Sequence, residues 1–336
     1  MRTRSMVRAG LVAALAALAF QLPAGAQPVL PKGLPKAGEL KKYDDVVTKE
    51  FTTSTGLFAV HRQDDKLYFE IPQDKLGRLF LWRAEVAKGP GGSSWGGAEL
   101  GSTVLKFERR GNKVYLWKVG FSKRSDGKAV QAAVEASATD SIIAVFAVEC
   151  EGKDRSAVIG VSDTFISGLS DLPITRAAGS PGASVDVSRS FLSEVKAFPG
   201  NIEVRATVTF RGGGGGGLGG GLGGPPGLGG GAGRSVTALV HHSLALLPET
   251  PMQGRYFDPR VGYFTESFSD FAHPRGWTQT REFITRYRLE KKNPNEAVSE
   301  VVKPITFYLS KEIPEKWRPY MKKGVEDWAP AFEAAG

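Results

Sequence analysis

The sequence predicts an α+β fold that consists mainly of antiparallel β-strands. Period-two alternation of apolar residues recurs along the chain between turn-forming residues, and helical periodicity is scarce before residue 315. The segments 103–109 and 113–119 alternate on both sides of Arg110-Gly111-Asn112, which is typical of a hairpin. We therefore expect a β-rich N-terminal region that is followed by a strand and a helix within 301–336.

Three short strands are expected first, at 57–61, 66–71 and 79–86, and they define a small β domain over 46–90. A larger β-rich domain is expected over 91–300. Its further strands are predicted at 141–150, 156–161, 201–210, 234–247, 255–264 and 281–289. Residues 188–198 fit a short helix and a strand equally well.

Residues 212–233 are almost entirely glycine. Such a run has too little side-chain area to offset the entropy of ordering it, so it predicts a flexible loop. Strand-like runs at 203–210 and 235–246 place this loop at the tip of a long hairpin. A phosphate-binding loop is excluded, because Leu228 occupies the position where that motif requires glycine.

The C-terminal residues predict a strand at 305–310 and an amphipathic helix at 315–335. Pro319 fits a first helical turn, whereas Pro330 must kink or interrupt the helix. The apolar stripe of the helix requires a partner surface, because each large apolar side chain left in water forgoes roughly 1.5–3 kcal/mol. That stripe consists of Trp317, Met321, Val325, Trp328 and Phe332.

The N-terminus has the features of an export signal over residues 1–26. Three arginines precede a short apolar core at 11–20, and Ala24-Gly25-Ala26 fits the small-x-small pattern, so we expect cleavage after Ala26. An uncleaved anchor is the alternative, but the apolar run is far shorter than the roughly 20 residues that span a bilayer. Residues 27–45 are expected to be a linker. The predicted location is periplasmic or extracellular, with no membrane span after cleavage.

Charge and cysteine content exclude other classes of protein. The chain has 44 basic and 35 acidic residues, and loss of three arginines with the signal leaves 41 against 35, or +6. The charges are interspersed, so no nucleic-acid partner is expected. Cys150 is the sole cysteine, which excludes an intramolecular disulfide, and its apolar neighbours predict a buried structural thiol.

No catalytic or metal-binding residue can be assigned from motifs. Ser94 lies in a G-x-S-x-G match, but glycines and another strand follow it instead of a helix, so a serine hydrolase would need His and an acid to converge there. The four histidines include no H-E-x-x-H motif. Two of them are adjacent in a predicted strand and should point to opposite faces. The candidates for an interdomain or substrate-facing surface are His241, His242, Asp258, Arg260 and Tyr263.

The order of segments resembles the N-terminal region of bacterial secreted zinc-dependent metalloproteases. The resemblance covers nearly the whole mature chain and rests on residues 57–61, 67–72, 94–97, 104–111, 198–205, 234–248, 258–264 and 314–336. In that family two domains of unknown function precede a zincin-type catalytic domain. The resemblance implies that 301–336 begins this catalytic domain, whose H-E-x-x-H helix has no match here.

The predicted function is therefore that of a non-catalytic N-terminal portion of a zinc-dependent metalloprotease, truncated before its catalytic motif. It could brace the catalytic domain, inhibit it or present a peptide or protein substrate. No cofactor is expected in this chain, and zinc belongs to the missing domain, which is the expected partner. Whether the chain itself is an enzyme stays open. The alternative is a stand-alone exported binding module for a polymer or a cell-envelope partner. That module would pack the C-terminal helix stripe on its own sheet.

Overall fold

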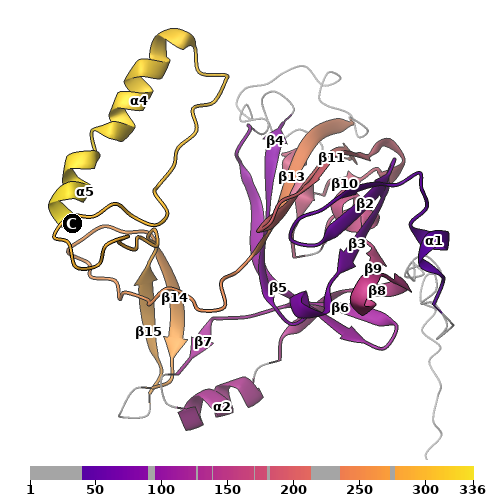
Figure 1. Cartoon of the computed structure of the whole chain (residues 1–336), viewed down its shortest axis with the longest axis horizontal. Coiled ribbons are helices and arrows are strands. Elements are labelled where there is room, and N and C mark those ends of the chain that lie inside the picture. Colours follow the sequence, from indigo (N-terminus) through magenta and orange to yellow (C-terminus); the bar gives the residue numbers. More distant parts are fainter. Residues whose placement is uncertain are drawn as a thin grey trace, which may run out of the picture. The chain divides into compact units, whose positions relative to one another are not determined.

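A computed structural model of the chain describes residues 40–89, 95–125, 128–137, 139–169, 171–179, 182–212, 235–272 and 277–336 (Figure 1). The chain divides into two compact units, 1–38 and 39–336, and only the second is described. It is rich in β-strands, most of which pair antiparallel, and this confirms the predicted fold class. The expected signal with Ala26, most of the expected linker, Ser94, His273 and the glycine-rich residues 213–233 lie outside the described residues.

Twelve strands form the main sheet, in the order β1-β2-β3-β9-β8-β6-β5-β4-β13-β12-β10, with β11 also paired to β12. Strands from the two predicted β domains join it, since β3 pairs with β9 and β4 pairs with both β5 and β13. The strands are β1 Thr52–Ser54, β2 Ala59–Gln63, β3 Lys66–Ile71, β4 Leu79–Lys88, β5 Glu99–Arg110, β6 Lys113–Lys118, β8 Ser141–Glu151, β9 Ala157–Gly160, β10 Ser184–Val185, β11 Phe191–Ala197, β12 Asn201–Arg211 and β13 Val236–Leu246.

The sheet is nearly closed, because β11 returns to β1 and β2 at its opposite end. The Leu57 amide donates to the Phe198 carbonyl at 2.7 Å. The Ala197 amide donates to Ser54 Oγ at 3.0 Å, and the Leu192 amide donates to an Asp65 carboxylate oxygen at 2.8 Å. These bonds cover backbone groups that an open edge would expose. Residues 188–198, for which the sequence left two choices, form mainly this strand.

The core lies on the inner face of this sheet. Residues of β4 alternate between buried and more exposed positions, as the period-two pattern requires. The Phe80 and Phe107 rings meet edge to face with centroids 5.5 Å apart, and Phe165 from a short helix packs against Trp82 at 5.1 Å. A second, smaller cluster joins Val46, Cys150 and Val158. Cys150 is buried as predicted, and burial raises the pKa of its thiol to about 11.

The described helices are short. They are α1 Tyr43–Val46, α2 Lys128–Ser137, α3 Ser162–Ile166, α4 Arg318–Glu326 and α5 Ala329–Ala335, with 3₁₀ turns at Gln73–Lys75, Lys153–Arg155, Ile174–Ala178, Val187–Arg189 and Glu315–Trp317. Helix α2 was not expected from the sequence, because its alanine-rich composition favours a helix without producing a long apolar period. Of the helices that can be described, none is long and apolar enough to cross a membrane.

A second sheet of three strands lies outside the main one, in the order β15-β14-β7. Its strands are β7 Lys123–Arg124, β14 Thr265–Asp270 and β15 Gln279–Ile284. The prediction of a strand at 255–264 was wrong, because the Asp258-Pro259 step forms a turn. In this turn the Val261 amide donates to the Asp258 carbonyl at 3.0 Å. The predicted strand at 281–289 ends at Ile284, after which no partner strand is present among the described residues.

Two hairpins were predicted correctly. In the first, Arg110 pairs with Lys113 across a turn where Gly111 adopts a positive φ of 59°, a conformation that glycine tolerates well. In the second, the β12–β13 register runs from Asn201–Ala245 to Phe210–Val236. The glycine-rich residues are inserted after this last pair, as the sequence predicted.

Replacement of residues 213–233 by a four-residue turn is expected to leave the β12–β13 register intact. Closing a loop of about 22 residues costs about 1–2 kcal/mol more than closing one of about four residues, so the shortened chain should unfold at a slightly higher urea concentration. Urea titration followed by circular dichroism measures the shift. A loss of stability would contradict the interpretation of these residues as a passive insertion.

Candidate functional site

Half of the large apolar side chains that are exposed in the described chain lie in the C-terminal segment, which we define as residues 285–336. None of these residues is buried, although all are described. Typical soluble domains do not leave so many large apolar side chains in contact with water, and large exposed patches mark interaction sites. The exposed members are Tyr287, Leu289, Val298, Val302, Phe307, Tyr308, Leu309, Trp317, Tyr320, Met321, Val325, Trp328 and Phe332.

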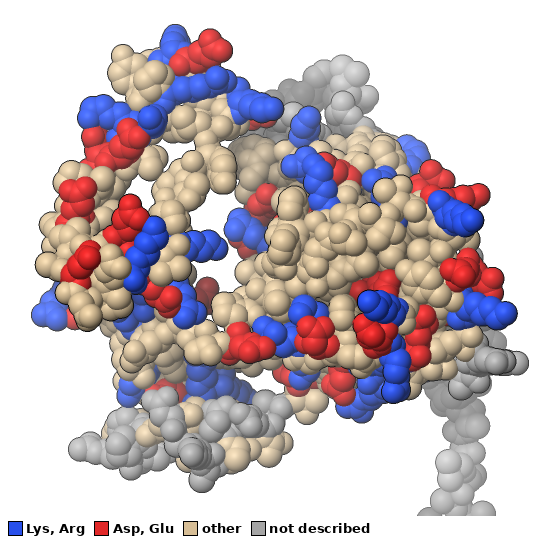
Figure 2. Space-filling view, in the orientation of Figure 1, with Lys and Arg blue, Asp and Glu red and all other residues tan. Residues whose placement is uncertain are grey.

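The predicted helix of this segment is present but interrupted. α4 ends at Glu326 and α5 begins at Ala329, and each has a proline at its first or second position, as expected for Pro319 and Pro330. Its apolar stripe stays exposed, with Trp328 at 67% and Phe332 at 50% of full exposure. On the opposite face, Lys322 and Lys323 form ion pairs with Glu326 and Asp327. Figure 2 shows basic and acidic side chains interspersed on the face that it draws.

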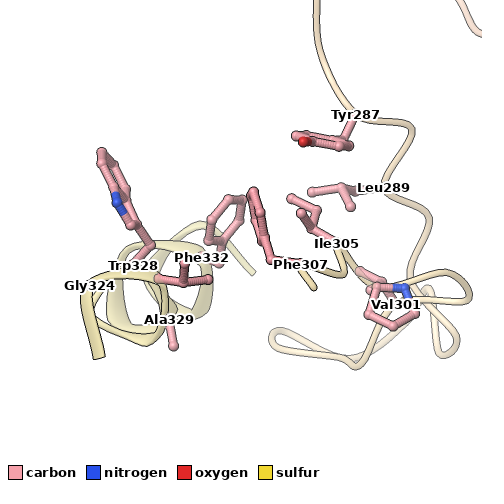
Figure 3. Close-up of a pocket in the computed structure, with 11 residues that line it drawn as sticks. Tyr287, Leu289, Val301, Ile305, Phe307, Gly324, Trp328, Ala329 and Phe332 are labelled. Carbon is pink, nitrogen blue, oxygen red and sulfur yellow. The ribbon is translucent and has the colours of Figure 1, made fainter. Parts of the chain in front are cut away.

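A groove of about 480 Å³ runs between the two helices and the chain that precedes them (Figure 3). One wall is formed by the two helices and the residues that join them, through Gly324, Val325, Trp328, Ala329 and Phe332. Phe307 faces Phe332 from the other wall. The remaining residues of that wall are Tyr287, Leu289, Val301, Pro304 and Ile305. The lining is almost wholly apolar, so it suits an apolar partner surface better than a polar substrate.

The strand predicted at 305–310 is absent. Residues 305–309 have no regular secondary structure, and no hydrogen bond joins their backbone N–H and C=O groups to any described residue. The prediction was wrong because a strand requires a neighbouring strand as well as a suitable pattern. The alternation itself is present, since Ile305 and Phe307 line the groove while Tyr308 is 92% exposed.

Three candidate surface residues lie in the loop before β14. Asp258 and Arg260 are exposed and form an ion pair with each other, with Arg260 Nη2 2.5 Å from an Asp258 oxygen. Bonds from the Arg260 side chain and backbone lower the pKa of the Asp258 carboxyl. Tyr263 is half exposed, and the adjacent Phe264 is 89% exposed. This loop is therefore a second exposed aromatic surface.

His241 lies on the outer face of the main sheet between two carboxylates. Its Nδ1 is 3.1 Å from Glu85 of β4, and its Nε2 is 2.6 Å from Glu203 of β12. The bond to Glu203 raises the pKa of His241 above its usual range, and the bond to Glu85 adds to this shift although burial opposes it. Burial raises the pKa of the Glu203 carboxyl. The hydrogen bonds from His241, Ser243 and Asn201 outweigh this effect and lower the pKa below its usual value.

His242 points into the core, so the two adjacent histidines face opposite sides of the sheet as predicted. Its Nδ1 accepts a hydrogen bond from Trp82 Nε1 at 3.2 Å, which places the ring proton on Nε2. That Nε2 faces the Phe165 backbone without a well-formed hydrogen bond. Burial, and then the neighbouring His241 charge, lower the pKa of His242 to about 3. Its role is that of a neutral core residue.

A further polar network, which no sequence motif indicates, centres on Glu70 of β3. The carboxylate accepts bonds from Tyr43 at 3.0 Å and Ser156 at 2.6 Å, and it lies 2.9 Å from His61 Nε2. The opposite ring nitrogen of His61 lies 2.8 Å from Thr53 Oγ1. The bond with His61 is the main cause that lowers the pKa of Glu70 to about 2. The network ties α1 to the sheet.

No group of three or more His, Cys, Asp or Glu side chains within the described ranges is arranged to hold a metal. The carboxylates beside His241 lie at opposite ring nitrogens, so they cannot converge with the ring on one ion. His242 is enclosed in the core. The hypothesis of a serine hydrolase stays untested, because Ser94 and His273 lie outside the described residues.

Comparisons with known proteins support only part of the resemblance. No curated protein and no solved structure matches the chain significantly. Residues 40–89 match Domain of unknown function (DUF5118), and residues 97–292 match Domain of unknown function (DUF5117). The expected pair of domains of unknown function is thus confirmed, while neither description mentions a metalloprotease. Since the second match spans more than half of its residues, the chain belongs to the DUF5117 family.

Proposed function

We propose that this chain is the non-catalytic N-terminal portion of an exported zinc-dependent metalloprotease, that its β-rich region braces the catalytic domain, and that residues 301–336 begin that domain. The observation that carries the proposal is the absence of any buried residue in 285–336. Helical residues that bury little of their surface gain little packing energy to offset their ordering entropy. A domain that covers this surface would supply that energy.

The composition of the segment supports a protein partner. Trp, Tyr and Phe dominate the energetic centres of protein interfaces, and Trp317, Trp328 and Phe332 all lie on one helical stripe. Each large apolar side chain that becomes buried contributes roughly 1.5–3 kcal/mol. A few of them, together with the groove beside Phe307, would hold a domain that is already tethered by the chain.

The proposal assigns zinc chemistry to the partner domain. Such a domain needs paired histidines to hold zinc-activated water and a glutamate to accept its proton. The described histidines of this chain are committed to Glu70, Glu85, Glu203 and Trp82.

The alternative of a stand-alone binding module makes a different demand on the C-terminal helix. A self-sufficient module would pack the stripe of Trp317, Val325 and Phe332 on its own sheet. The stripe is exposed instead, and this favours the bracing proposal. Tyr256 and Tyr263 do offer exposed rings, but rings of this kind suit an interdomain contact equally well.

The gene downstream of codon 336 provides the test. We expect a coding run for H-E-x-x-H, either in frame or displaced by a frameshift or an assembly gap. The complete polypeptide should bind one zinc ion and hydrolyse peptides, whereas residues 27–336 alone should bind no zinc stoichiometrically in a titration. Unrelated sequence after a genuine stop codon would refute the proposal, and so would tight zinc binding by the shorter chain.

A further inference from the structure

The Glu70 network aligns three side chains across neighbouring strands of the main sheet. Thr53 of β1 pairs directly with His61 of β2, so the two side chains lie on the same face. Glu70 of β3 pairs with Ala59, two positions before His61, and reaches the same ring diagonally. Thr53 Oγ1 lies 2.8 Å from His61 Nδ1, and Glu70 Oε2 lies 2.9 Å from His61 Nε2. The row therefore consists of a hydroxyl, an imidazole and a carboxylate.

The carboxylate determines which ring nitrogen of the histidine carries the proton. The Glu70 carboxyl is ionised at neutral pH, because its pKa is about 2, so it can only accept a hydrogen bond. The neutral His61 ring therefore donates its proton from Nε2 to Glu70 and presents a lone pair at Nδ1. Thr53 donates its hydroxyl proton to that lone pair. In this arrangement a histidine can accept the proton of an attacking hydroxyl.

Burial shields the histidine from solvent and leaves the hydroxyl residue accessible. His61 is only 2% exposed, and its ring packs edge to face against Tyr43 with centroids 6.2 Å apart. Thr53 is exposed. Tyr43 of α1 and Ser156, which precedes β9, both donate to the Glu70 carboxylate and fix its orientation. A buried, oriented base beside an accessible hydroxyl is what nucleophilic chemistry requires.

The position of β1 adds donors for the charge that develops when a hydroxyl attacks a carbonyl group. β1 is the end strand of the main sheet, and among the described residues its backbone bonds with β2 alone. Adjacent N–H groups of a strand point to opposite edges, so an amide at Thr53 or next to it faces away from β2. Such an N–H group can stabilise the oxygen anion that the attack produces.

We propose that Thr53 is an activated nucleophile that takes up an acyl group from an activated carboxylic ester. Its Oγ1 attacks the carbonyl carbon of the ester, and His61 Nδ1 accepts the hydroxyl proton. The bond between this carbon and the leaving-group oxygen then breaks, and the protonated His61 ring gives the proton to that oxygen. The acyl group stays on Thr53 as an ester. Glu70 is a positioning residue, because it acts only through His61. This inference goes beyond the proposed function, which needs no acyl acceptor.

Incubation of the purified chain with p-nitrophenyl acetate tests the inference. We expect a burst of p-nitrophenolate that is stoichiometric with the chain, and peptide mass spectrometry should find an acetyl group on Thr53. Thr52 and Thr55 are internal controls, because both are exposed in the same segment and neither bonds to a described histidine. They should stay unmodified. The absence of a burst, or acetyl groups on other residues only, would overturn the inference.

Two substitutions separate a chemical role of the row from a structural one. In His61→Gln the amide can still accept a hydrogen bond from Thr53 and donate one to Glu70, but it cannot take up a proton during the attack. Acetylation of Thr53 should slow by roughly 100-fold or more, the usual contribution of a general base, while circular dichroism stays unchanged. An acetylation rate equal to that of the parent chain would show that these hydrogen bonds only tie the strands together.

Thr53→Val keeps the shape of an exposed side chain, so it tests the inference even if His61→Gln fails to fold. It should abolish the burst, and an undiminished burst would overturn the inference.

Nitrogen NMR of the His61 ring tests the role of Glu70. In the parent chain the neutral ring should carry its proton on Nε2. Glu70→Gln should give a mixture of both tautomers and slower acetylation of Thr53, because an amide can either donate or accept a hydrogen bond at that position. The same single tautomer in both chains would overturn the positioning role of Glu70.

Discussion

Lowering the pH from 7 to 3 is expected to unfold the main sheet, with His242 as the largest single cause. Its folded pKa of about 3 lies below the usual value of 6.5, so the unfolded chain binds the proton more readily between these values. Stability therefore falls as the pH drops through this window, by about 4 kcal/mol at pH 3. Glu70 acts in the same direction below its usual value of 4.5, because its folded pKa is about 2. It removes about 2 kcal/mol more at pH 3.

These two losses are a large share of the 5–15 kcal/mol that stabilises a typical domain. The His242→Gln variant should unfold at nearly the same urea concentration at pH 4.5 and pH 7, because glutamine can accept the Trp82 hydrogen bond but cannot bind the proton. Urea titrations followed by tryptophan fluorescence at several pH values measure this slope.

His241→Gln is the matched control, since His241 is adjacent in sequence but faces the carboxylates on the outer surface. The raised pKa of His241 means that its contribution is fully present below pH 6.5 and is lost as the pH rises through the folded value. His241→Gln should leave the loss of stability below pH 6.5 unchanged. It should reduce the loss of stability that accompanies a rise in pH above 6.5. If the urea midpoint of His242→Gln still falls between pH 7 and pH 4.5 as steeply as that of the parent chain, the His242 ring is not the group that resists protonation.

The parts of the fold that local patterns control were predictable, and the long-range pairings were not. The β5–β6 hairpin follows from alternation around Gly111, and both depend on neighbours in sequence. The pairing of β4 with β13 joins residues about 160 positions apart, and no local feature specifies it. For the same reason the Glu70 network was missed, because Tyr43, His61 and Ser156 converge on it from separate segments.

The candidate site was predictable in its residues and not in its backbone. The apolar stripe and the effect of Pro330 follow from helical periodicity, which a helix keeps without a partner. Alternation at 305–310 predicted a strand, but a strand exists only when another one pairs with it. At 255–264 the alternation came from exposed aromatic residues and did not reflect a buried face.

A pair of phenylalanine substitutions should separate the folding core from the docking surface. Phe80→Ala removes a fully buried ring that packs on Phe107 and Phe58, and we expect it to lower the free energy of unfolding by about 3–5 kcal/mol. Phe332→Ala removes the same side chain from the half-exposed helix stripe. In the chain ending at Gly336 it should change the free energy of unfolding by no more than roughly 0.5 kcal/mol.

If the proposed function is right, the contrast should change in the complete polypeptide, where a catalytic domain follows this chain. If that domain covers the stripe, Phe332→Ala in the complete polypeptide leaves a cavity in a buried interface, and its cost should rise to about 2–4 kcal/mol. Phe80→Ala should cost the same in both chains, because its surroundings do not depend on the partner. Urea unfolding of the four variants and their parents measures both differences. A Phe332→Ala cost that is equally small in both chains would place the catalytic domain elsewhere, since burial of this ring is what distinguishes a docking surface from an exposed helix.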